Sequence, residues 1–170
     1  MQEEPDPRWL CRADVRRALT AVGDAGLVYD LLVTPRQLAA AIETVRTLPD
    51  VRFVLDHAGK PAIADGALEP WRTDLAALAA APNVAVKLSG LVTETAQDWT
   101  LEQLRPYTEA LLEAFGPERI MFGSDWPVCL LAASYDEVFA AAQELTAGLS
   151  AAERIAVFGG TAAFWCGIVA

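Results

Sequence analysis

The chain has 170 residues, 54 % of them hydrophobic and 21 % charged, and a formal net charge of -10. This length and composition are typical of one globular domain, and the negative charge argues against nucleic acid as a partner, because phosphate backbones are bound by basic surfaces. The N-terminus lacks the basic start and apolar core of a signal peptide, and no stretch has the roughly 18 apolar residues that cross a bilayer, so we expect a cytoplasmic protein with no membrane partner.

Four short apolar runs predict buried strands, and they start near Leu27, Val51, Val84 and Arg119. Each run is rich in Val, Leu, Ile or Phe and is largely continuous rather than alternating, which is typical of a parallel sheet covered by helices. The starts lie 24, 33 and 35 residues apart, enough for a strand, a loop, a helix and a return loop.

Helices are predicted between and after these strands. Three of them open on a capping box, in which a Ser or Thr precedes a Glu or Gln by three residues. The boxes pair Thr34 with Gln37, Ser134 with Glu137, and Ser150 with Glu153. Apolar patterns over residues 74–81 and 104–116 predict further helices. The alternation of strand and helix, without a hairpin signal, predicts an α/β fold with a parallel sheet.

Two architectures share this pattern. A doubly wound nucleotide-binding fold usually has a glycine-rich turn after an early strand, but neither G-x-G-x-x-G nor G-x-x-x-x-G-K-[ST] occurs in this sequence. A (β/α)8 barrel needs eight strands and usually about 250 residues, whereas only four strands are predicted. The residue pattern therefore leaves two alternatives, a small open sheet or half of a barrel.

Polar residues follow three of the predicted strands, at the end where sheets of this kind bind ligands. His57, the only histidine, ends the second strand. Lys87 and Ser89 end the third strand, and Asp125 and Trp126 follow the fourth. Because the carboxyl ends of parallel strands meet at one edge of the sheet, we expect these side chains to converge on one pocket.

Strand phase predicts which face these side chains share. If each strand stays regular to its end, His57 lies on the same face as Leu55, and Asp125 on the same face as Met121. Both residues also have a structural interpretation. A single histidine can simply hydrogen-bond at a strand end, and Ser-Asp-Trp-Pro is a common kind of turn.

Two further side chains have two interpretations each. Asp30 interrupts the first predicted strand, where a carboxylate is costly unless it is paired. It is either an ion-pair partner for a buried cation such as Lys87 or a catalytic group. Trp126 either walls a substrate pocket or packs under its own loop.

The segments "FVLDHAGKP", "VAVKLSGLVTE" and "RIMFGSDWPV", in this order and at these spacings, resemble motifs of the amidohydrolase-related (amidohydrolase 2) lactonase family. That family includes L-fuconolactonases, L-rhamnono-lactonases and 2-pyrone-4,6-dicarboxylate lactonases. The resemblance implies a TIM (β/α)8 barrel of the metal-dependent hydrolase superfamily. Residues 1–170 would then be a single partial barrel domain with the last four βα units. The N-terminal barrel strands would be absent, and Met1 stands where mid-barrel sequence is expected.

The activity that the resemblance implies is hydrolysis of a small-molecule lactone, a sugar lactone or a related carboxylic lactone, in carbohydrate catabolism. Asp125 matches the family's general base, which takes a proton from the attacking water. His57 matches the histidine that stabilises the tetrahedral oxyanion. Lys87, Ser89 and Trp126 are then expected to bind substrate.

The resemblance also bears on metal binding. Related hydrolases bind a divalent metal through a His-x-His pair, a later His and a terminal Asp, of which only His57 and Asp125 are present in this sequence. A zinc site normally needs three or four protein ligands, so we expect no firmly bound metal in this chain, although a complete barrel could hold a single divalent metal such as zinc.

Two other functions stay open. One is a metal-dependent hydrolase or decarboxylase of the wider superfamily. The other is a non-catalytic half-barrel that forms a homo-oligomer, because a four-strand half-barrel has unpaired edges and an open apolar interior.

Overall fold

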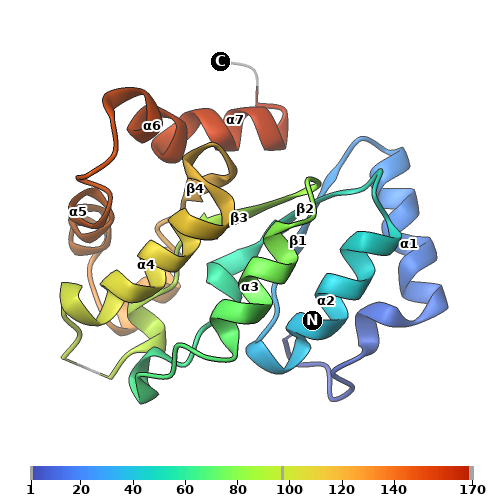
Figure 1. The fold of residues 1–170 in the computed structure, drawn as a ribbon, viewed down its shortest axis with the longest axis horizontal. Helices are drawn as coiled ribbons and strands as arrows, with labels where there is room; N and C mark the ends of the chain where they lie inside the picture. The colour runs from blue at the N-terminus through green and yellow to red at the C-terminus, as the bar shows by residue number, and fades with distance from the viewer. Residues whose placement is uncertain (1, 97, 169–170) are drawn as a thin grey trace.

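Four parallel strands form one sheet in the computed structural model, which describes residues 2–96 and 98–168 (Figure 1). They are β1 (Val28–Leu31), β2 (Arg52–Leu55), β3 (Val84–Leu88) and β4 (Ile120–Phe122). Each strand pairs with the next one along the chain. All four predicted strands are confirmed. Residues 1, 97 and 169–170, which belong to the predicted domain, lie outside the described residues.

The order of the strands distinguishes the two architectures. A doubly wound sheet reverses its strand order at a switch point, whereas the strands of a (β/α)8 barrel follow one another around the sheet. The described strands run in the order β1-β2-β3-β4 without a reversal. The sheet is therefore a set of four consecutive strands of the barrel type.

The α-helices of the described residues alternate with the strands and then follow them. They are α1 (Ala13–Asp24), α2 (Pro35–Thr47), α3 (Trp71–Ala79), α4 (Leu101–Phe115), α5 (Tyr135–Leu145), α6 (Ala151–Ile155) and α7 (Thr161–Cys166). The three predicted capping boxes are present at the starts of α2, α5 and α6. Within the described ranges, no helix is both long enough and apolar enough to cross a membrane.

Three details of the helices differ from the expectation. Helix α4 begins before residue 104, because Thr100 and Gln103 form a further capping box. A π-helical turn, Ala156–Gly160, separates α6 from α7. Helix α1 is not predicted by the sequence patterns, because it buries only Val15 and Leu19, too few apolar residues for a clear helical stripe.

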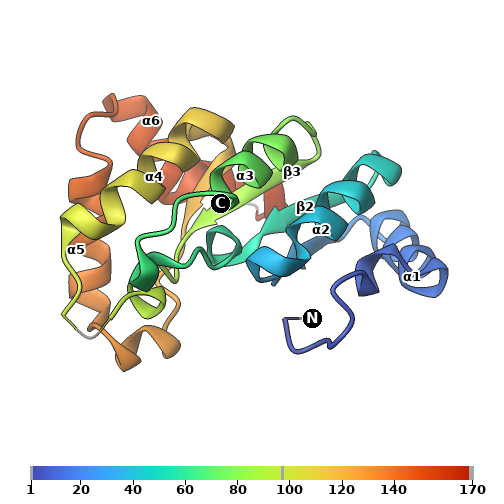
Figure 2. The same cartoon turned by 60° about the horizontal axis from the view of Figure 1, so that its bottom comes forward.

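Helices α2, α3 and α4 lie side by side over one face of the sheet (Figures 1 and 2). Side chains of alternate strand residues pack beneath them in the large hydrophobic core, among them Phe53, Leu55, Val84, Val86 and Ile120. This is the outer face of a barrel segment. The opposite, inner face carries the alternate residues of each strand.

The inner face has a second, smaller core under the C-terminal helix. Its buried members are Val54, Ala85, Met121 and Trp165. Helix α7 reaches the inner face at the amino ends of the strands, where the Arg52 guanidinium donates to the carbonyl of Phe164 at 3.4 Å. The expectation of an open apolar interior is therefore wrong for this part of the face, because Trp165 of α7 covers it. The carboxyl ends of the strands lie at the other end of the sheet.

Candidate active site

The loops after β2, β3 and β4 bring three of the predicted residues together. His57 Nδ1 lies 2.9 Å from Ser89 Oγ, a hydrogen-bond distance. On the other side of the ring, Nε2 lies 3.6 Å from Asp125 Oδ1 and 3.6 Å from Asp56 Oδ2. The side chains of His57, Asp56 and Asp125 are all largely buried. A single imidazole is thus held between one hydroxyl and two carboxylates, and the convergence of His57, Ser89 and Asp125 matches the expectation.

The backbone reaches this arrangement by leaving the strands early. β2 ends at Leu55 and β4 at Phe122, and His57 and Asp125 both have left-handed backbone angles, with φ of 48° and 57°. The assumption that the strands stay regular as far as His57 and Asp125 is therefore wrong. Left-handed residues other than glycine cost about 1–3 kcal/mol each and cluster where surrounding structure holds them for a function.

Two glycines make room for the histidine and its hydroxyl partner. A Cβ at Gly90, whose φ is +65°, would lie 2.7 Å from His57 Nδ1. A Cβ at Gly123 would lie 3.1 Å from Ser89 Cβ. Sequence reasoning did not assign either glycine to the site. The sequence did contain a signal for them, because each glycine lies directly beside a polar residue at a strand end.

Lys87 is held by two carboxylates on the inner face. Its ammonium donates to Asp30 Oδ2 at 2.7 Å and forms an ion pair with Asp56 Oδ1 at 3.0 Å. Burial lowers the pKa of Lys87, but the contacts with Asp30 and Asp56 outweigh burial and raise this pKa above its ordinary value. Lys87 is therefore a permanent cation at neutral pH. Of the two interpretations of Asp30, the ion pair with Lys87 is the one that the structure contains.

Asp125 has the surroundings of a carboxylate that can accept a proton. Its side chain is only 10 % exposed. Burial raises the pKa of the Asp125 carboxyl above its ordinary value, an effect that His57 and Lys60 oppose and that the charges of Asp56 and Glu94 reinforce. A carboxylate with a raised pKa is a stronger base than an exposed one, which suits removal of a proton from water.

Two other residues lie in the loops after β2 and β4. Trp126 is 63 % exposed, so it does not pack under its loop, and its role in binding substrate stays a prediction. Lys60, in the loop after His57, forms an ion pair with Glu94 at 2.5 Å. That pair ties the loop after β2 to the short helix Val92–Glu94 after β3.

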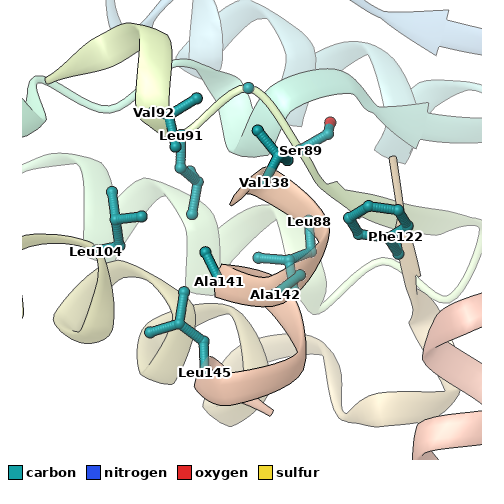
Figure 3. A pocket seen from close by; sticks show the side chains of 11 residues that line it. Leu88, Ser89, Leu91, Val92, Leu104, Phe122, Val138, Ala141, Ala142 and Leu145 are labelled. Carbon is teal, nitrogen blue, oxygen red and sulfur yellow. The ribbon is translucent and has the colours of Figure 1, made fainter. Parts of the chain in front are cut away.

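A small cavity lies behind Ser89, on the helix side of the sheet (Figure 3). It has a volume of about 30 Å³ and is lined mainly by apolar side chains, such as Leu88, Leu104, Val138 and Leu145. In Figure 3 the Ser89 hydroxyl points away from these side chains. Organic ligands need cavities of about 300 Å³ or more, so this one is a packing defect and not a substrate pocket.

The described residues do not by themselves build a metal centre. Across residues 2–96 and 98–168, no group of three or more His, Cys, Asp or Glu side chains is placed to hold a metal ion. At the imidazole, Asp56 is already paired with Lys87, which leaves His57 and Asp125 as candidate ligands. Two ligands are fewer than a zinc site needs.

Comparisons with known proteins identify relatives of this chain. The family model for "Amidohydrolase" matches residues 1–165. An L-fucono-1,5-lactonase from Burkholderia multivorans is 48 % identical over 178 residues, which cover 96 % of this chain and 59 % of that protein. An L-rhamnono-gamma-lactonase from Scheffersomyces stipitis is 27 % identical over 128 residues, which cover 64 % of this chain and 38 % of that protein.

A solved structure resembles the whole described chain. The crystal structure of an amidohydrolase from Burkholderia multivorans with bound zinc has a TM-score of 0.95 and 46 % identity to this chain. The match covers 99 % of this chain and 62 % of that one. The chain thus spans about three fifths of the length of the two Burkholderia multivorans proteins. Given a family match over nearly its whole length, the chain belongs to the amidohydrolase family.

Proposed function

We propose that this protein hydrolyses a sugar lactone, and that L-fucono-1,5-lactone is the substrate to test first. One observation carries the proposal: Asp125, a buried carboxylate with a raised pKa, lies 3.6 Å from the only histidine, at the carboxyl ends of barrel strands. The substrate class rests on the lactonase that is 48 % identical to this chain. Because the chain spans 59 % of that lactonase, activity of the whole protein is part of the proposal.

Asp125 would act as the general base. Its ionised carboxylate removes a proton from a water molecule while the water oxygen bonds to the lactone carbonyl carbon. The carbonyl π electrons move to the oxygen, which gives a tetrahedral oxyanion. When the ring C–O bond then breaks, the leaving alkoxide takes up the proton that Asp125 holds. The products are an open-chain hydroxy acid and a regenerated base.

His57 would stabilise the oxyanion. With Ser89 donating its hydroxyl proton to Nδ1 at 2.9 Å, the imidazole carries its own proton on Nε2. Nε2 then faces the space beside Asp125, where it can donate to the developing oxyanion. The left-handed backbone at His57 and the absence of a Cβ at Gly90 favour this ring position.

Zinc is bound in the amidohydrolase structure from Burkholderia multivorans, which makes zinc the first metal to test with this chain. A Lewis acid beside His57 and Asp125 would polarise the lactone carbonyl. These two donors, the only candidates at the imidazole among the described residues, do not by themselves complete a zinc site. Further ligands would have to come from a segment that completes the barrel.

Two further properties belong to this proposal. The three cysteines are free, which fits a reducing compartment such as the cytoplasm. Self-association is the second candidate function, favoured by the outer edges of β1 and β4, which have no partner strand among the described residues.

The test of the proposed function is hydrolysis of L-fucono-1,5-lactone and other aldonolactones, followed by proton release in weakly buffered solution. We expect Asp125→Asn to lower kcat by about 10²–10⁴-fold, because the amide cannot accept the proton from water. Asp136→Asn, an exposed change in the first turn of α5, is the matched control and should keep the rate. Full activity in Asp125→Asn contradicts the assignment of the base.

A further inference from the structure

A row of alternating charges crosses the inner face of the sheet beside His57. It starts at Asp30 in β1, continues through Lys87 in β3 to Asp56 at the end of β2, and reaches the imidazole. The contacts are 2.7 Å from Lys87 Nζ to Asp30 Oδ2 and 3.0 Å from Nζ to Asp56 Oδ1. The other oxygen of Asp56, Oδ2, lies 3.6 Å from His57 Nε2. One carboxylate therefore faces a lysine and the catalytic histidine at the same time.

Because the Asp56 carboxylate is buried, its orientation is set by the cation that pairs with it. Its side chain is 14 % exposed, and a buried carboxylate is costly unless a cation pairs with it. Lys87 supplies that cation and is itself held by Asp30. With Oδ1 turned to Lys87, Oδ2 is left facing the imidazole.

The two carboxylates beside Nε2 differ in their partners. Asp56 is neutralised by Lys87 in direct contact, whereas the ion-pair partner of Asp125 in the described residues is His57. The Asp56 carboxylate is thus already held by a cation. Its geometry suits orientation of the ring rather than proton transfer.

We propose that Asp56 is a positioning residue that keeps the proton of His57 on Nε2, and that Lys87, anchored by Asp30, fixes Asp56 for this purpose and does not contact substrate. The inference rests on the proposed function, because the Nε2 proton is the one that serves the oxyanion. It gives Lys87 a different role from substrate binding, which the sequence favoured.

Asp56→Asn should move the ring proton of His57 from Nε2 to Nδ1. In this variant Lys87 retains the amide oxygen as its acceptor, so the amide NH₂ group is turned toward Nε2. An NH₂ group can only donate, and Nε2 must then accept, which moves the ring proton to Nδ1. Adding Lys87→Met releases the amide, which can rotate to present its oxygen and restore the Nε2 proton.

The tautomer can be read directly, because His57 is the only histidine in the chain. Two-bond ¹H–¹⁵N spectra of the imidazole, recorded at a pH where the ring is neutral, give one set of signals. We expect the Nε2–H form in the unchanged protein, a shift toward Nδ1–H in Asp56→Asn, and return to Nε2–H in Asp56→Asn/Lys87→Met. Asp50→Asn, an exposed change just before β2 at the far end of that strand, is the matched control. An unchanged tautomer in Asp56→Asn overturns the proposal.

Steady-state kinetics with the lactone separate positioning from substrate binding. We expect kcat to fall about 10²-fold or more in Asp56→Asn with KM within about threefold, since a trapped wrong tautomer costs a serine protease triad about 10⁴-fold. The double variant should recover part of kcat at the same KM. A rise of about tenfold in KM on removal of Lys87 shows contact with substrate and overturns its assigned role.

The two proposals can fail separately. The expected tautomer changes without lactone hydrolysis would support the positioning role and contradict the proposed function. Lactone hydrolysis that depends on Asp125 but not on Asp56 would contradict the positioning role and support the proposed function.

Discussion

Single residues hold the imidazole in place by backbone shape as much as by side-chain contacts. His57 and Asp125 both occupy the left-handed region, which costs each of them about 1–3 kcal/mol. The left-handed backbone turns the His57 ring toward Gly90, which has no Cβ and so leaves space for the ring. The position of the imidazole therefore depends on the φ angles of single residues in these loops.

Gly90→Ala tests this dependence on space. A methyl group at Gly90 would meet Nδ1 at 2.7 Å, so we expect the ring to move, kcat/KM to fall about tenfold or more, and the imidazole signals of His57 to shift. The backbone cost at φ of +65° should also destabilise the fold by about 1–2 kcal/mol. Lactone assays, NMR and urea unfolding measure the three effects.

Gly66→Ala is the matched control for that substitution. Gly66 has the same φ of +65°, but a Cβ there meets nothing within 4 Å. It should show the same loss of stability with an unchanged rate and unchanged His57 signals. Equal rates in Gly66→Ala and Gly90→Ala would show that the space beside His57 does not matter.

At the scale of secondary-structure elements, the sequence patterns predict what depends on local chemistry. The strands show as continuous apolar runs, and the caps at Thr34, Ser134 and Ser150 show as capping boxes. Helix α1 escapes prediction because it buries few apolar residues. The packing of α7 on the inner face also escapes, because sequence periodicity says nothing of which remote surface an apolar side chain will meet.

In the candidate site, too, some features are predictable from the sequence and others depend on tertiary contacts. The convergence of His57, Ser89 and Asp125 is predictable from their places at strand ends. The left-handed turns that aim His57 and Asp125 are not, because they depend on tertiary contacts that override strand regularity. The contact of Asp56 with Lys87 is also hidden from the sequence, since it joins the residue that follows β2 to a residue of β3 through their side chains.

Helix α7 is expected to stabilise the sheet through Trp165. Replacing this buried residue by Ala uncovers Val54, Ala85 and Met121 and should lower the free energy of unfolding by about 3–5 kcal/mol. The neighbouring Phe164 is 74 % exposed, so Phe164→Ala should cost less than about 1 kcal/mol. Denaturant unfolding compares the two variants, and equal losses would mean that α7 does not cover the inner face.

In the whole molecule, the apolar contacts of α7 and the charged candidate site lie at different ends of the sheet. Trp165 packs at the amino ends of the strands, and the charged site lies at their carboxyl ends, as in barrel enzymes generally. Substitution of Trp165 should therefore lower stability without a direct effect on the charged site.

The edges of the sheet lead to a prediction about assembly. Among the described residues, β1 and β4 each have one paired side, and unpaired parallel edges favour association. We expect light scattering to give a mass of at least twice the 18.2 kDa of one chain. A stable monomer at micromolar concentration contradicts self-association.

The pH dependence of kcat/KM for the proposed lactone reports on whether Asp125 is the general base. As the proposed base, Asp125 would act only when ionised, and burial raises its pKa. Activity should thus be complete at neutral pH and fall as the pH drops through a midpoint above that of an ordinary Asp, and the low residual activity of Asp125→Asn should lack this midpoint. A midpoint at or below the ordinary Asp value, or an unchanged profile in Asp125→Asn, would contradict the assignment of Asp125 as the base.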